Sequence, residues 1–134
     1  HAALAHARGA VIVVAWDMPF VSAALLRRLR ALGESGFDAA LPESGSKRGV
    51  GPVCAWAAPP CLDAITAALD RGDRRVIAFF DAVRVARLSA DAVATFGDPA
   101  TLFLNVNTAR ERDAAERCAR AQPDDATTER QDDA

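Results

Sequence analysis

Residues 11–20 read VIVVAWDMPF, and this stretch decides the expected fold. The run from Val11 to Ala15 is continuous and mostly β-branched, which is typical of a strand that is buried on both faces. Pro19 marks the end of the strand, because proline cannot donate a backbone hydrogen bond to a neighbouring strand. A strand of this kind predicts a mainly parallel sheet that is covered by helices on both sides.

Strand and helix patterns alternate along the rest of the chain. Ser22 and Thr108 are suited to cap helices, the latter with Glu111 in a capping box, and Gly33 and Gly72 are suited to end them. This alternation predicts right-handed β-α-β crossovers and an α/β fold. The elements expected after the first strand are a helix over 22–33, strands over 37–41 and 53–57, helices over 59–72 and 74–80, an extended piece over 84–88, a strand over 101–106 and a helix over 108–121.

Composition and charge exclude several classes of protein. The 134 residues are 51% hydrophobic and 25% charged, which fits one globular domain or a piece of one. A net charge of −2 excludes a strongly basic nucleic-acid binder, and the longest apolar stretch, 9–16, is too short to cross a bilayer. We therefore expect neither nucleic-acid nor membrane partners; the expected location is the cytoplasm, where the thiols would stay reduced.

The two ends of the chain differ in character. The chain opens on uncapped helix formers at 2–8, so we expect it to begin inside a helix, with the N-terminal part of the domain missing. A trimmed version of a complete small domain is the alternative. Residues 122–134 carry five acidic groups and one basic group and have few residues to bury. We expect a folded part over 1–121 and a disordered acidic tail over 122–134.

The motifs that are missing narrow the chemistry further. The three cysteines have no zinc-site spacing, which favours reduced thiols and leaves a Cys54–Cys61 disulfide only as an open alternative. The only histidines stand at positions 1 and 6, so a Ser-His-Asp or Cys-His site is not expected. No G-x-G-x-x-G motif occurs, and the loop over 44–51 lacks the order of a P-loop.

Polar residues at strand ends are the candidate functional groups, because ligands of open α/β sheets bind beyond the carboxyl ends of the strands. Asp17 follows the first strand and could hold Mg²⁺, or it could only hydrogen-bond its own turn. Asn105 and Asn107 would share one side of the last strand and could bind a ligand, or they could belong to the turn that caps the next helix.

Basic residues in two loops are the other candidates. Lys47 and Arg48 lie in a glycine-rich segment that could form an anion-binding concavity, or they could simply be exposed. Arg74 and Arg75 open a segment that could clamp a phosphate, although a solvated end is the more ordinary role of such a pair.

Read together, these segments resemble the molybdenum cofactor guanylyltransferases of the nucleotidyltransferase superfamily. Residues 13–20 are similar to that family's strand ending in C-D-x-P, and residues 48–55 are similar to its R-G-V-E-P-L-C-A stretch. Residues 72–77 resemble its G-x-R-R-V segment, and residues 103–108 resemble its F-x-N-V-N-T motif. The four motifs occur in the family's order within residues 1–121.

The resemblance implies a Rossmann-like three-layer fold and the transfer of GMP from GTP to molybdenum-molybdopterin, with release of pyrophosphate and with Mg²⁺. It implies that Asp17 is the catalytic residue that binds the metal and the GTP phosphates. It places Arg75, Asn105 and Asn107 on the molybdopterin side. Other proteins of molybdenum cofactor biosynthesis would be possible partners. Charge screening suits this reaction, because two polyanions must approach one another.

The sequence also departs from the family pattern. The family's glycine-rich nucleotide loop has no counterpart, so the chain resembles the C-terminal part of the enzyme and could be inactive by itself. Gly51, Trp16 and Ala109 stand where the family has Glu, Cys and Pro. Three alternatives stay open: a molybdenum cofactor cytidylyltransferase, a non-catalytic module that binds molybdopterin or a partner protein, and a truncated product that folds poorly.

Overall fold

The computed structural model describes residues 1–43 and 54–121. The chain divides into two compact units, one formed by residues 1–104 and the other by the residues from 105 onward. The first unit holds a four-stranded sheet and most of the helices, and the second holds helix α6 (Ala109–Ala121). Each unit is described by itself.

The sheet of the first unit is mixed. Its strands β1 (Val11–Val14), β2 (Ala39–Pro42), β3 (Cys54–Ala57) and β4 (Val85–Leu88) are arranged in the order β1-β3-β2-β4. Strand β3 is antiparallel to both of its neighbours, whereas β2 and β4 are parallel. Three strands thus share one direction and β3 opposes them. The predicted α/β class is confirmed, and the strands expected near 11, 37, 53 and 84 are all present.

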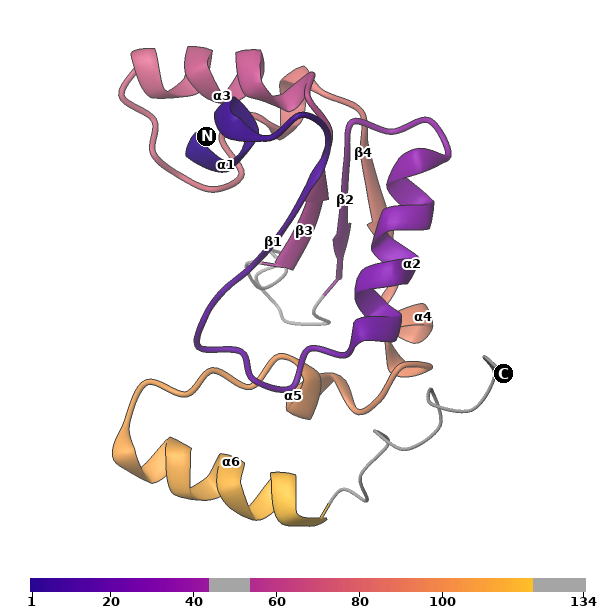
Figure 1. Cartoon of the computed structure of the whole chain (residues 1–134), viewed down its shortest axis with the longest axis vertical. Helices are drawn as coiled ribbons and strands as arrows, with labels where there is room; N and C mark the ends of the chain where they lie inside the picture. The colour runs from indigo at the N-terminus through magenta and orange to yellow at the C-terminus, as the bar shows by residue number, and fades with distance from the viewer. Residues whose placement is uncertain (44–53, 122–134) are drawn as a thin grey trace, which may run out of the picture. The chain divides into compact units, whose positions relative to one another are not determined.

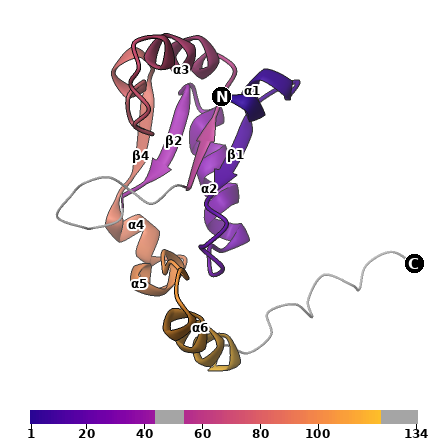
Figure 2. The ribbon, with the colours of Figure 1, turned by 90° about the vertical axis from the view of Figure 1, so that its left-hand side faces the viewer.

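Helices cover both faces of this sheet (Figures 1 and 2). Helix α2 (Ala23–Glu34) packs on one face, where Leu25 and Leu29 are fully buried in a cluster with Trp56. Helices α1 (Ala2–His6) and α3 (Cys61–Asp70) lie on the other face, where Leu4 and Cys61 pack with Ala39 and Ala57. Along each strand, successive side chains point to opposite faces of the sheet, as the pleat requires. The result is the predicted three-layer arrangement.

Helix α2 shows one correct and one incorrect prediction. Ser22 caps it as expected, since its hydroxyl accepts a 3.2 Å hydrogen bond from the Leu25 amide. Gly33 does not end the helix, which continues to Glu34. Gly33 is buried against the indole of Trp56, and a Cβ at this position would clash with the ring. The missing side chain therefore serves close packing between α2 and β3 rather than helix termination.

Helix α3 ends as the sequence predicts. Gly72 has a φ of +77°, the left-handed conformation that favours glycine after a helix. Its amide donates to the Leu69 carbonyl at 2.8 Å, and the amide of Asp73 donates to the Ala68 carbonyl at 3.0 Å. This pair of hydrogen bonds satisfies the last carbonyls of the helix and fixes the backbone of Asp73.

Two predicted elements are wrong. The helix expected over 74–80 is a series of turns that leads into η1, a short 3₁₀-helix at Phe80–Ala82. The strand expected over 101–106 is replaced by helix α5 (Pro99–Leu102) and by irregular backbone up to Asn107. Asp98 caps α5 through its carboxylate, with Pro99 in the first turn, so a local helix-start signal outweighs the apolar run that follows. Helix α4 (Ala90–Ala94) was not predicted.

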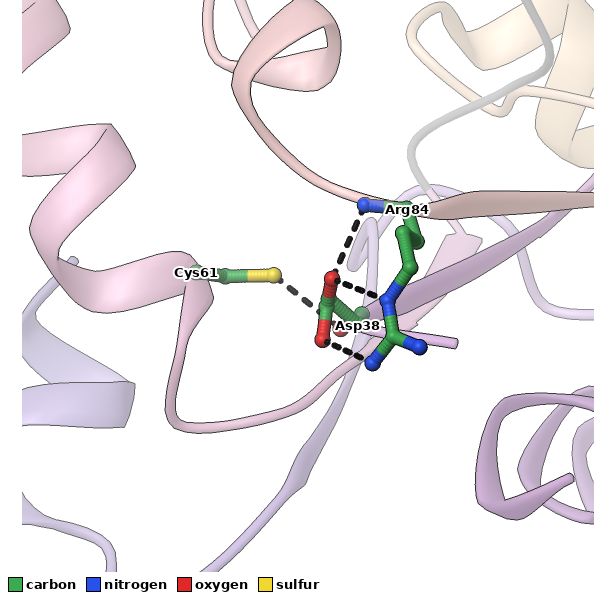
Figure 3. A network of polar contacts seen from close by, with 3 residues as sticks. All are labelled: Asp38, Cys61 and Arg84. Carbon is green, nitrogen blue, oxygen red and sulfur yellow. Dashed lines mark hydrogen bonds and ion pairs between the residues drawn. The ribbon is translucent and has the colours of Figure 1, made fainter. Parts of the chain in front are cut away.

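A polar network joins three elements at the starting end of β2 and β4 (Figure 3). The carboxylate of Asp38 accepts hydrogen bonds from the Arg84 amide at 2.9 Å and from Arg84 Nε and Nη2 at 3.2 Å each. Cys61 Sγ donates to the Asp38 carbonyl at 3.0 Å. Arg84 holds the pKa of the Asp38 carboxyl below its ordinary value through these bonds. The network fixes the starts of β2, β4 and α3 relative to one another.

In the second unit, the predicted capping box of α6 is confirmed. The Thr108 hydroxyl accepts from the Glu111 amide at 3.2 Å, and Glu111 Oε2 accepts from the amides of Asn107 and Thr108 at 2.9 Å. The loop with Lys47 and Arg48, for which an anion-binding role and simple exposure were both open, lies outside the described residues, as do Gly51 and the predicted tail over 122–134. No helix among the described residues is both long and apolar enough to cross a membrane.

Candidate functional site

The turn after β1 holds Asp17 at the carboxyl end of that strand. The Met18 amide donates to the Ala15 carbonyl at 3.2 Å, which closes the turn. Met18 is 4% exposed and anchors the turn in the core beneath α2, whereas Trp16 is 94% exposed. Asp17 is half-buried between them. An anchored turn of this kind gives the carboxylate a defined position at the edge of the sheet.

The Asp17 carboxylate is available for a ligand as far as the described residues show. Among them it has neither a hydrogen-bond nor an ion-pair partner, so the alternative in which it only hydrogen-bonds its own turn finds no support there. The described residues contain no group of three or more His, Cys, Asp or Glu side chains that could hold a metal. The single carboxylate of Asp17 still fits Mg²⁺, which proteins often bind through one carboxylate together with substrate phosphates and water.

Arg75 lies on the segment after α3 and is held by a neighbouring carboxylate. Its side chain is 73% exposed, and Asp73, whose side chain is 27% exposed, accepts from Arg75 Nε at 3.0 Å and from Nη2 at 2.6 Å. The Arg75 amide also donates to Asp73 at 3.1 Å. These bonds from Arg75 lower the pKa of the Asp73 carboxyl to about 2. The guanidinium is therefore an oriented cation at the surface.

A groove of about 320 Å³ lies beside Arg75, on the sheet face opposite α2. Its walls are mostly apolar and come from β1, β3, α1, α3 and the segment over 73–80. Arg74, Arg75 and Asp73 are among its lining residues, whereas Asp17 is not. The groove could therefore accept a ligand with an apolar body and an anionic group. The predicted site residues Asp17 and Arg75 belong to one unit, but they do not share this groove.

Asn105 and Asn107 belong to the second unit, and the reasoning that paired them is wrong. They do not lie on a strand, so strand alternation does not place them on a common side. Both residues are exposed, and the Asn107 amide takes part in the cap of α6. The alternative in which this segment caps the next helix is thus correct for the backbone. A ligand-binding role for the two side-chain amides stays a prediction.

The cysteines take no part in a disulfide. All three are free thiols, with Cys54 and Cys61 buried and Cys118 exposed. Cys54 packs in the cluster beneath α2, whereas Cys61 packs in the cluster on the opposite face. Burial raises the pKa of the Cys54 thiol to about 11, which keeps it protonated and unreactive near neutral pH. The open alternative of a Cys54–Cys61 bridge is therefore excluded in this structure.

Asp73 is the polar residue of this region that the sequence analysis missed. An acid placed directly after a helix-ending glycine and two residues before Arg75 was the available signal. Its structural role also depends on the hydrogen bond from its own amide to the Ala68 carbonyl, which fixes the backbone of Asp73.

Comparisons with known proteins place the chain in a family. Residues 1–92 match the family model described as the MobA-like NTP transferase domain. A probable molybdenum cofactor guanylyltransferase of Pelotomaculum thermopropionicum is 37% identical over 109 residues, which cover 81% of this chain and 52% of the relative. A molybdenum cofactor guanylyltransferase of Desulfosudis oleivorans is 29% identical over 109 residues, with coverage of 81% and 53%.

A solved structure gives the same assignment. The crystal structure of molybdopterin-guanine dinucleotide biosynthesis protein A from Archaeoglobus fulgidus superposes with a TM-score of 0.77 at 29% identity. The match covers 91% of this chain and 61% of that one. This chain spans about half the length of the curated relatives that it matches. On the family model, the sequence relatives and the shared fold, the chain belongs to the MobA-like NTP transferase domain family.

Proposed function

We propose that this chain takes part in the transfer of GMP from GTP to molybdenum-molybdopterin, with release of pyrophosphate. The family membership and the guanylyltransferase names of its relatives support a nucleotidyltransferase. The single observation that carries the proposal is the half-buried Asp17 carboxylate, held on an anchored turn at the carboxyl end of β1 without a described partner. GTP is abundant in the cytoplasm, which is the compartment that we propose.

In this reaction a phosphate oxygen of the acceptor forms a bond to the α-phosphorus of GTP. The bond between that phosphorus and the oxygen that bridges to the β-phosphate breaks, and pyrophosphate leaves. No protein nucleophile is required, so the protein acts by positioning and by charge screening. Mg²⁺, when bound, would neutralise phosphate charge at Asp17. Asp17 would orient the triphosphate, and Arg75 would attract the phosphate of the acceptor.

The resemblance also supports a role of Asn105 and Asn107 in binding the acceptor. Their exposed amides offer both donors and acceptors to a polar ligand. Both residues lie beyond residues 1–92, which the family model matches, so their assignment rests on the F-x-N-V-N-T resemblance.

The test is a transfer assay on this chain and on the longest polypeptide that its gene encodes. Each protein is incubated with Mg²⁺, molybdenum-molybdopterin and either GTP or CTP, and the released pyrophosphate is measured. We expect Mg²⁺-dependent release with GTP in the longer polypeptide, and much less release with CTP. Faster release with CTP would identify the cytidylyltransferase instead. Absence of turnover with both nucleotides in both proteins would overturn the proposal and favour a binding module.

A further inference from the structure

The backbone of Asp73 has a defined position at the end of α3. Gly72 turns the chain at the end of α3, and the Asp73 amide donates to the Ala68 carbonyl at 3.0 Å. Asp73 therefore begins from a backbone that is fixed to the last turn of a ten-residue helix. The segment that follows consists of turns, which by themselves would leave a long side chain free to rotate.

Asp73 holds the next-but-one residue in a planar, two-point contact. Nε and Nη2 of Arg75 both donate to its carboxylate, and the Arg75 amide adds a third bond. An arginine has five N–H donors, so three of those on Arg75 stay available for another anion. Arg74 makes no ion pair among the described residues and also lines the apolar groove. The two arginines thus differ, because only Arg75 is oriented.

We propose that Asp73 is a positioning residue, which holds the Arg75 guanidinium at the groove so that its remaining donors meet the phosphate of the molybdopterin acceptor. This inference rests on the proposed function, since it takes Arg75 as an acceptor contact. Orienting a long side chain in advance lowers the ordering cost of binding, and one such side chain is worth about 3- to 10-fold in affinity. If Asp73 only neutralised the charge of Arg75, it would weaken anion binding rather than strengthen it.

The test measures the dissociation constant of molybdenum-molybdopterin by equilibrium dialysis at pH 7, with the chain as it exists and without nucleotide. The variants are Asp73→Asn, Asp73→Glu, Arg75→Ala and the double variant Asp73→Asn with Arg75→Ala. Asp70→Asn is the matched control, because it removes the same charge from the end of α3 without an ion pair among the described residues. Thermal unfolding of each variant shows whether the fold is kept.

We expect Arg75→Ala to weaken binding by about 30-fold, as the loss of a charge-assisted phosphate contact. Asp73→Asn should weaken it by about 5-fold, Asp73→Glu should recover part of that loss, and Asp70→Asn should have no effect. In the Arg75→Ala background, Asp73→Asn should cause no further loss, because Asp73 acts through Arg75.

Two results overturn the positioning role, and they are distinguishable. If Arg75→Ala weakens binding but Asp73→Asn leaves it equal or tighter, Asp73 does not position Arg75 for the ligand, and the proposed function stands. If Arg75→Ala itself leaves binding unchanged, Arg75 does not contact the acceptor. Both the acceptor assignment and the positioning role are then wrong.

Discussion

The aspartates at the two ends of the sheet, Asp38 and Asp17, differ in their hydrogen-bond partners. Asp38, at the start of β2, is engaged by Arg84 through three hydrogen bonds, and its own carbonyl accepts from Cys61. Asp17, after the carboxyl end of β1, has no partner among the described residues, although its turn is anchored by Met18. A carboxylate that is already satisfied stabilises the fold, whereas one that is held in place without a partner is suited to bind a ligand.

The largest expected effect tests the Asp17 end of this comparison. Asp17→Asn should lower Mg²⁺-dependent transfer by about 100-fold or more, because it removes the charge that would hold the metal and the triphosphate. The rate of pyrophosphate release in the active polypeptide measures the loss. The midpoint of thermal unfolding should stay within about 1 °C of the parent, since no described contact is lost. A large drop in that midpoint together with full activity would mean that Asp17 stabilises the fold and does not bind the metal or the triphosphate.

The next effect tests the Asp38 end. Asp38→Ala should lower the midpoint of thermal unfolding by about 5 °C, because three bonds from Arg84 lose their acceptor. Transfer activity at a temperature where the protein is folded should not change. Asp70→Ala is the matched control, as it removes an acid with no ion pair in the described part of the chain. Equal midpoints for the two variants would show that the network contributes nothing to stability.

A smaller effect concerns the thiol of the same network. Cys61→Ala should lower the unfolding midpoint by about 3 °C, since it removes a buried sulfur and its hydrogen bond to the Asp38 carbonyl. Cys118→Ala should leave the midpoint unchanged, because Cys118 is exposed. Differential scanning calorimetry under reducing conditions measures both. If Cys118→Ala proved the more destabilising of the two, burial of Cys61 would not matter for stability.

The smallest effect is on the pH dependence of stability. Arg84 lowers the pKa of Asp38 from its ordinary value of 3.8, and Arg75 lowers that of Asp73 to about 2. Because each pKa is lower in the folded state, the stabilisation is complete above about pH 5 and is lost as the pH falls through the folded pKa values. The unfolding midpoint should therefore decline between pH 5 and 2.

The variants sharpen this last prediction. Asp38→Ala should show a shallower decline than the parent, because one of the carboxyls whose pKa is lowered in the folded state is absent. Asp70→Ala should follow the parent curve. Parallel curves for parent and Asp38→Ala would mean that the ion pair with Arg84 does not persist in solution.

Sequence patterns predicted helix ends best, because these depend on residues that are close together in the chain. Ser22 before α2, Gly72 after α3 and the Thr108–Glu111 pair before α6 each depend on contacts within a few residues, and each is confirmed. The expected strand over 101–106 failed because Asp98 and Pro99 start a short helix just before it. None of the residues 101–106 belongs to the four-stranded sheet.

The residues of the candidate site also differ in how far a local sequence pattern could predict them. Asp17 was predicted because it closely follows a strand, and position along the chain is enough to place it at a sheet edge. The juxtaposition of Asn105 and Asn107 was derived from a strand that does not exist, so that derivation failed. Asp73 was missed because its role depends on where α3 leaves its backbone and on the fold of the next two residues.

The sequence by itself determined the α/β class, the approximate positions of α1, α2, α3 and α6, and the presence of an aspartate soon after β1. These features follow from hydrophobic periodicity and from capping groups, which act over a few residues. Only the tertiary structure decided that β3 runs against its neighbours, that Gly33 admits the Trp56 ring, and that Asp73 holds Arg75 beside a groove. An apolar strand fits a sheet in either direction, and a close approach depends on residues far apart in the chain, so neither can be derived from a local pattern.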